Sequence, residues 1–116
     1  MAKIDLSKCM PSCSLEQLDP KVTAILSQIV HYTDRDVFVS SGFRSIEHEK
    51  KQGRDGSSSH TKGLACDILV KDNEERAKFL YLLFGLGAVR IGIGKNFIHF
   101  DLDKDKPFPR CWTYYE

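Results

Sequence analysis

Apolar residues recur with helical spacing in the segment that follows Asp19-Pro20. They stand three or four positions apart, at Val22, Ile25, Leu26, Ile29 and Val30. This spacing is typical of an amphipathic helix with one face on a core. Asp19 is a favourable N-cap and Pro20 suits the first helical position, so we expect a helix from there to about Tyr32. Residues 1–18 lack such a pattern and are expected to form an irregular lead-in.

Several shorter runs have the composition and alternation of β-strands. Residues 37–43 are rich in β-branched and aromatic side chains. In residues 64–70 the side chains should alternate between two faces, with Cys66 and Ile68 on one face and Asp67 on the other. Two further strands are expected at 89–93 and 97–102, joined by a turn at Gly94-Lys95-Asn96. The last predicted edge strand contains Trp112, Tyr114 and Tyr115.

A second long helix is expected after Asp72, which together with Glu75 resembles a capping box. Residues 77–84 are apolar nearly all round, which predicts a central helix that is covered on most sides. A short helical stretch is expected at 46–52. Helices and strands are mixed without regular alternation. We therefore predict an α+β fold with a central antiparallel sheet packed against helices, in a single domain over residues 1–116.

The charge balance excludes some classes of function. The chain has 17 basic and 16 acidic residues, for a net charge of +1. This balance argues against a broad nucleic-acid surface and against a polybasic membrane anchor. No apolar run is long enough to span a bilayer, and the N-terminus lacks the apolar stretch of a signal peptide. We expect a monomer that is made in the cytoplasm and either stays there or leaves by a route that the sequence does not show.

The cysteines are Cys9, Cys13, Cys66 and Cys111. Four cysteines permit two disulfides, but without a secretory signal we expect free thiols. Cys9 and Cys13 could supply half of a second metal site, although no other close pair is present to complete it. Cys66 is expected to pack in the core as a small apolar residue.

The candidate chemistry lies in His60, Asp67 and His99. Two imidazoles and a carboxylate are donors that a catalytic zinc uses, with water in the fourth position. His99 lies in a strand whose alternation should send Ile98 and Phe100 to the helices and place His99, Asp101 and Asp103 on an open polar face. His60 and Asp67 are seven positions apart, so a bend at Lys62-Gly63 is needed to bring them together. Ser58 could hydrogen-bond one of the ligands.

Two motifs and one strand resemble a known family. The first motif, Ser58-x-His60-x-x-Gly63-x-Ala65-x-Asp67, is similar to the S-x-H-x-x-G-x-A-x-D signature of the zinc D-Ala-D-Ala peptidases of the M15 type. Residues 97–101 look like the third-ligand strand of its compact, often phage-associated branch. Residues 41–48, Ser-Gly-Phe-Arg-Ser-Ile-Glu-His, resemble another segment of that branch. The resemblance covers roughly residues 19–103.

The resemblance implies a small α+β fold that is shared with the hedgehog signalling domain. It implies a zinc ion at His60, Asp67 and His99, and hydrolysis of peptidoglycan stem peptides by a carboxypeptidase or an endopeptidase. Arg44 is then expected near the substrate, where its guanidinium can form a fork onto a carboxylate. His48 and Ser58 are further candidates for contact with the substrate.

One departure from the family concerns the general base. Much of the family has an acidic residue three positions before the third ligand, but this chain has Asn96, which cannot take a proton. Asp101 either replaces that base or orients a ligand imidazole, and Asp103 and His48 are weaker candidates for the base. Without a base the protein would instead be a zinc-stabilised binding domain or a phage structural protein of the same fold. An active phage enzyme could reach the cell wall through membrane holes made during lysis.

Overall fold

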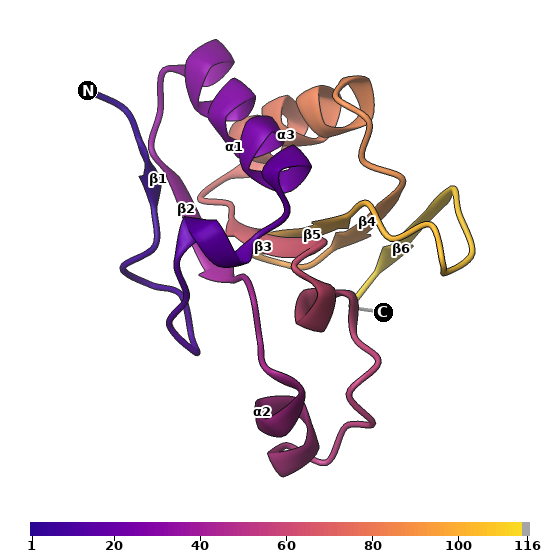
Figure 1. Ribbon diagram of the computed structural model, residues 1–116. Coiled ribbons are helices and arrows are strands. Elements are labelled where there is room, and N and C mark those ends of the chain that lie inside the picture. Colours follow the sequence, from indigo (N-terminus) through magenta and orange to yellow (C-terminus); the bar gives the residue numbers. More distant parts are fainter. Residues whose placement is uncertain (115–116) are drawn as a thin grey trace.

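A six-stranded sheet forms the centre of the computed structural model, which describes residues 1–114 (Figure 1). The strands are β1 (Ile4–Asp5), β2 (Val37–Ser41), β3 (Ala65–Leu69), β4 (Arg90–Ile93), β5 (Phe97–Asp101) and β6 (Arg110–Thr113). The helices are α1 (Pro20–Thr33), α2 (Ile46–Lys51) and α3 (Asn73–Gly85), with 3-10 turns η1 (Leu15–Gln17) and η2 (Ser59–Lys62). The predicted α+β class is confirmed.

The strands follow the order β1-β2-β3-β5-β4-β6. The four central strands pair antiparallel, as expected, whereas β1 pairs parallel with β2 and β6 pairs parallel with β4. The sheet is therefore mixed at both edges. The sequence did not predict this, because the alternation of side chains shows that a segment is a strand but not the direction of its neighbour. β6 confirms the expected strand around Trp112, while Tyr115 lies outside the described residues.

The lead-in is more ordered than its sequence indicates. It contains the strand β1 and the 3-10 turn η1, so the expectation of an irregular segment over residues 1–18 was wrong in part. The backbone N–H of Val37 donates to the Lys3 carbonyl at 3.0 Å, and the Lys3 N–H donates to Asp36 Oδ1 at 2.9 Å. A strand of two residues is too short to show an alternating pattern, so pairing with β2 determines it.

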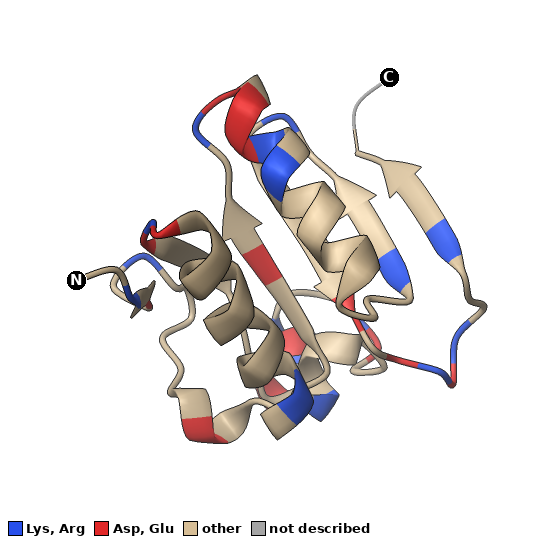
Figure 2. Cartoon of the chain, turned by 90° about the horizontal axis from the view of Figure 1, so that it is seen from above, with Lys and Arg blue, Asp and Glu red and all other residues tan. Residues whose placement is uncertain are grey.

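The helix α1 matches its prediction closely. Asp19 accepts a hydrogen bond from the Lys21 N–H, Pro20 opens the helix, and the apolar stripe packs into the core. The helix ends at Thr33, and the C-cap residue Asp34 has a left-handed conformation. Figure 2 shows α1 and α3 side by side across the strands.

The prediction that α3 is covered on most sides was wrong. Phe79 and Leu83, one helical turn apart, are buried against the sheet, while Tyr81 is 82% exposed and Phe84 57% exposed. The two long helices form a single layer, so only one stripe of α3 can face the sheet. Asp72 caps the helix as expected, because its side chain accepts the N–H of Glu75 at 2.8 Å.

The core lies between this helix layer and one face of the sheet, where Ile68, Ile98 and Phe100 are fully buried. The other face of the sheet looks toward α2 and η2 (Figure 1). Side chains alternate along a strand, so Asp67 and His99, which adjoin these core residues in sequence, point to the second face. No helix within residues 1–114 is long and apolar enough to cross a bilayer.

Candidate metal centre

His60 is held by the tight turn η2. Its backbone N–H donates to Ser58 Oγ at 3.1 Å, and the turn ends at Gly63, whose φ is +71°. A side chain at Gly63 would place Cβ 2.6 Å from the carbonyl oxygen of Gln17, so glycine is required both for the angle and for the close approach. The predicted bend is therefore confirmed, and it brings His60 to the face of β3 that carries Asp67.

Asp67 and His99 are directly opposite each other on β3 and β5. Side chains opposite each other in an antiparallel pair lie on the same face with their Cβ atoms about 5 Å apart. His99 Nδ1 lies 2.9 Å from Asp67 Oδ1, and His60 Nε2 lies 3.5 Å from the same oxygen. The structure thus brings together the three residues that the sequence singles out as metal ligands.

The spacing of these three donors fits a zinc ion. All three ligand atoms lie within 4.8 Å of one another. Zinc takes nitrogen and oxygen ligands at about 2.1 Å in tetrahedral geometry, which places neighbouring ligand atoms roughly 3.4 Å apart. Asp67 Oδ1 lies 2.9 Å and 3.5 Å from the two nitrogens, close to that value.

The second nitrogen of each imidazole has its own partner. His60 Nδ1 lies 2.8 Å from the Gly42 carbonyl oxygen, to which it can only donate. His99 Nε2 lies 2.7 Å from Asp101 Oδ2. If a metal ion were bound, protons on these two outer nitrogens would leave the lone pairs of His60 Nε2 and His99 Nδ1 for the ion. Metal-binding histidines are usually oriented by such hydrogen bonds, so this arrangement also fits a metal site.

The metal-free electrostatics show how closely the groups interact. Burial alone raises the pKa of Asp67, but hydrogen bonds from His60 and His99 outweigh it and hold that pKa well below its usual value. Burial lowers the pKa of His99, but hydrogen bonds to Asp101 and Asp67 raise it by more, so the net shift of this pKa is upward. Asp67 therefore stays a carboxylate, the form in which it can bind a cation.

The polar face of β5 is less open than expected. His99 is 8% exposed and Asp101 only 1%, so the prediction of an open face was wrong for these residues. Asp101 Oδ1 accepts the Asp103 N–H at 3.1 Å, and Arg90 Nε lies 3.3 Å from the same carboxylate. Both oxygens of Asp101 are thus engaged by neighbours within the protein, and Oδ2 faces His99.

Arg44 follows β2 and lies at the edge of the centre. Its Nη2 is 3.5 Å from Ser58 Oγ, and its Nε is 3.5 Å from Glu49 Oε2. Glu49 is fully buried on α2 and also binds Arg54 at 2.7 Å. Arg44 is therefore paired with a buried carboxylate on one side and lies beside Ser58 on the other. The sequence alone did not single out Glu49, although it directly follows the 41–48 motif.

A cavity of about 330 Å³ surrounds these groups. It is lined by Arg44, Ser58, Ser59, His60, Asp67, Arg90, Phe97, His99, Asp101, Lys106, Trp112 and Tyr114. The aromatic wall, Trp112 and Tyr114, was not predicted to lie at the site. A Cβ atom at Gly92 would lie within 2.7 Å of both rings, so glycine there lets the wall pack directly onto β4.

Other candidates from the sequence lie elsewhere. His48 on α2 does not line this cavity, and Asn96 lines a different hollow beside Phe38. Asp103 is fully buried and accepts from Ser59 Oγ at 2.6 Å and from Lys62 Nζ at 3.1 Å. It joins the end of β5 to the turn that carries His60, and it does not face the metal centre.

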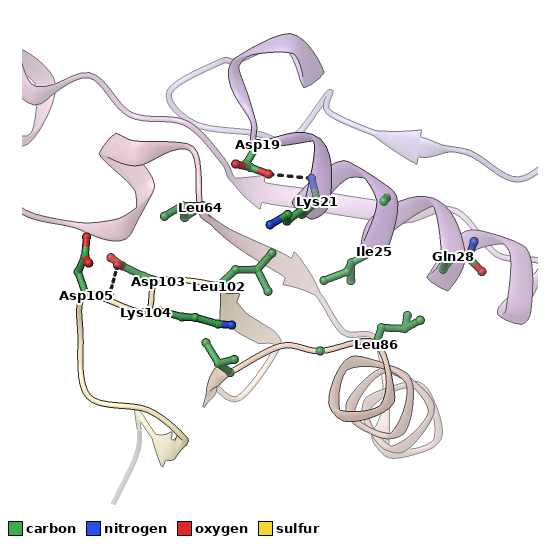
Figure 3. Close-up of a pocket in the computed structure, with 13 residues that line it drawn as sticks. Asp19, Lys21, Ile25, Gln28, Leu64, Leu86, Leu102, Asp103, Lys104 and Asp105 are labelled. Carbon is green, nitrogen blue, oxygen red and sulfur yellow. Dashed lines mark hydrogen bonds between the residues drawn. The ribbon is translucent and has the colours of Figure 1, made fainter.

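A larger hollow of about 610 Å³ lies on the helix side of the sheet. Its apolar floor includes Ile25, Leu86 and Leu102, and charged residues such as Lys21 and Lys104 form its rim (Figure 3). It contains none of the three candidate ligands. Size alone therefore does not identify the functional site of this protein.

The chain is thus a small α+β protein with three donors that converge on one face of its sheet. It belongs to the Peptidase M15 family, whose sequence profile matches residues 4–101. Its fold is similar to that of the L-Ala D-Glu endopeptidase ChiX of Serratia marcescens, with a TM-score of 0.59 and 18% identity over 87% of this chain and 90% of that chain. No curated protein matches the chain.

Proposed function

We propose that the protein is a zinc peptidase that hydrolyses peptide bonds of peptidoglycan stem peptides. The observation that carries the zinc assignment is the convergence of His60 Nε2, Asp67 Oδ1 and His99 Nδ1, with each imidazole held by a partner at its other nitrogen. Membership of the M15 family supports peptide hydrolysis. Among the bonds of the stem we favour the L-Ala–D-Glu bond, because the similarly sized neighbour is an L-Ala D-Glu endopeptidase.

A zinc ion bound here would lower the pKa of a water molecule and polarise the scissile carbonyl. Two neutral imidazoles and one carboxylate leave the occupied site with a net positive charge. That charge, in a partly buried cavity, favours the negative charge that develops on the carbonyl oxygen. The lowered pKa of Asp67 keeps this one ligand in its anionic form at neutral pH.

Asp101 acts on the reaction through His99. Its Oδ2 accepts the Nε2 proton of His99, and its Oδ1 is occupied by the Asp103 N–H, with Arg90 alongside. A carboxylate held in this way orients the imidazole and raises its basicity. We therefore assign Asp101 to the positioning of His99, the second of the two roles that the sequence allows.

Arg44 is the proposed contact for a substrate carboxylate. It lines the cavity beside Ser58, and the buried Glu49 carboxylate lies 3.5 Å from its Nε. A guanidinium can form two parallel hydrogen bonds to a carboxylate. Stem peptides carry free carboxylates close to their scissile bonds, so Arg44 can fix the register of the chain across the metal centre.

A binding protein without turnover is the second candidate function. Among the cavity residues within 1–114, the carboxylates are Asp67 and Asp101, and both have assigned partners. A free base for the attacking water is therefore lacking among these carboxylates. This observation favours a zinc-stabilised domain that binds stem peptides and releases them intact.

Incubation with defined stem peptides separates the two functions. The zinc-loaded protein is mixed with L-Ala-D-Glu-containing tripeptides and with pentapeptides that end in D-Ala-D-Ala, and products are identified by mass spectrometry. Release of L-Ala is the expected result, and release of D-Ala would indicate a carboxypeptidase. Binding without any product, with zinc present at one ion per chain, would contradict the peptidase and support the binding domain. Asp67→Ala should give no product.

A further inference from the structure

Cys9 and Cys13 lie next to each other in the ordered lead-in. Their sulfur atoms are 3.4 Å apart, and the Met10 N–H between them donates to the Ser40 carbonyl of β2 at 3.1 Å. Cys9 is buried, whereas Cys13 is partly exposed. A Cβ atom on Gly42 would lie 2.7 Å from Cys13 Sγ and 3.7 Å from Cys9 Sγ. The two thiols therefore occupy the space that Gly42 leaves open.

We propose that Cys9 and Cys13 form a redox-active thiol pair, which closes to an intramolecular disulfide on reaction with a small-molecule disulfide. The bond would restrict the movement of Gly42, whose carbonyl oxygen lies 2.8 Å from His60 Nδ1 and accepts its hydrogen bond. The thiol pair is independent of the proposed peptidase function. Only its effect on the metal centre depends on the assignment of His60 as a zinc ligand.

The chemistry is a pair of exchange steps. The Cys13 thiolate attacks one sulfur of the small disulfide and forms a mixed disulfide, and the departing thiolate takes up the proton that Cys13 lost. The Cys9 sulfur then attacks the Cys13 sulfur, loses its own proton and releases the second small thiol. Two protein thiols are oxidised, and one small disulfide is reduced to two thiols.

The surroundings determine the order of these steps. Burial, together with the hydrogen bond to Cys13, raises the pKa of the Cys9 thiol to about 11. Cys9 is thus protonated and shielded at neutral pH, and the accessible Cys13 meets the oxidant first. Once the mixed disulfide has formed, Cys9 is already in place, because a disulfide needs the sulfurs to move only about 1.4 Å closer.

The other cysteines are in different places. Cys66 is buried on the central strand β3, and Cys111 is exposed on β6, at the opposite edge of the sheet from β1. Cys111 can react with an oxidant but cannot reach the lead-in within one chain. It can form links between chains, so it is replaced by serine in the tests of the disulfide.

The first test maps the disulfide. Protein with Cys111→Ser, which prevents links between chains, is incubated with oxidised glutathione, quenched in acid, unfolded, alkylated and digested for mass spectrometry. Cys9 and Cys13 are expected in one peptide that has lost both thiol hydrogens and resists alkylation, while Cys66 is alkylated. A glutathione adduct that persists on Cys13 beside an alkylated Cys9, or a link to Cys66, would overturn the proposal.

The second test measures the bracing. Oxidation of the Cys111→Ser protein should raise its melting temperature by on the order of 5 °C, because the bond restricts the unfolded chain. The same treatment of a variant that also carries Cys13→Ser, which leaves the buried Cys9 in place, should have no such effect. An equal melting temperature for the reduced and oxidised forms would refute the brace.

The third test concerns His60. Zinc-loaded protein is mixed with an excess of chelator, and the oxidised form should release zinc several-fold more slowly than the reduced form. Equal release rates would overturn the link between the thiol pair and His60. Failure of the protein to bind zinc would instead refute the proposed function, while the first two tests would still decide the disulfide.

Discussion

Asp101 Oδ2 lies 2.7 Å from His99 Nε2, on the side of the imidazole away from Asp67. This contact lets Asp101 orient His99, one of the three proposed zinc ligands. It predicts that Asp101→Ala lowers the affinity for zinc. Zinc affinity should fall by about 10- to 100-fold, because the imidazole loses the group that orients it. Competitive titration with a zinc chelator measures this. Unchanged affinity together with lost peptidase activity would instead identify Asp101 as the general base.

Arg44 and Arg54 form a matched pair around the buried Glu49, but only Arg44 lines the cavity. Arg44→Lys should lower kcat/KM for stem peptides by about 10-fold or more, because lysine cannot form two parallel hydrogen bonds to a carboxylate. Arg54→Lys should retain most of the activity. Steady-state kinetics on one defined peptide gives both values, and equal losses in the two variants would refute substrate binding by Arg44.

Asp103 ties the His60 turn to β5 through Ser59 and Lys62. Asp103→Asn should reduce the free energy of unfolding at neutral pH by about 1–3 kcal/mol, as expected when a buried, charge-assisted network is weakened. Urea unfolding measures this change. Asp105→Asn is the matched control, because the Asp105 side chain is 87% exposed and lies 3.5 Å from Lys62 Nζ, so the effect of this change should be small.

The same carboxylate predicts a dependence on pH. Burial raises the pKa of Asp103, but hydrogen bonds from Ser59 and Lys62 lower it below the usual 3.8, so the folded state favours the charged form. Its contribution to stability is therefore present above pH 3.8 and is lost as the pH falls through the lowered pKa. The stability gap between wild type and Asp103→Asn should shrink in acid, and a constant gap would contradict this.

Gly63 has both a left-handed φ and a backbone contact, whereas Gly53 has a similar φ of +81° and open space around it. Gly63→Ala should destabilise the protein by about 1–3 kcal/mol more than Gly53→Ala, because only Gly63 would push Cβ against Gln17. Urea unfolding of both variants provides the comparison. Equal destabilisation would show that the contact with Gln17 relaxes freely.

The sequence predicted the elements that have strong local signals. The apolar stripe and cap of α1, the β4–β5 hairpin and the bend at Gly63 all follow from short-range chemistry, and the structure confirms them. The donor chemistry of His60, Asp67 and His99 indicated a metal site, the resemblance to a known family supported it, and the structure brings the three residues together.

The features that depend on contacts distant in sequence were missed. The exposure of Tyr81 on α3 depends on how many layers cover the sheet, which an apolar run does not reveal. The packing of Trp112 on Gly92 likewise arises only when β6 pairs with β4. Glu49 is close to Arg44 in sequence, but no local pattern shows that their side chains meet. The burial of Asp101 was also missed, because alternation shows which face a side chain takes but not what covers it.

The zinc content of the purified protein tests the central claim most directly. Wild type, His60→Ala, Asp67→Ala, His99→Ala and the control His48→Ala are freed of metal, reloaded with a small excess of zinc, desalted and analysed by elemental mass spectrometry. We expect one zinc ion per chain in wild type and His48→Ala, and almost none in the other three variants. Zinc retained by any folded variant of those three, or absent from wild type, would contradict a shared His60–Asp67–His99 site.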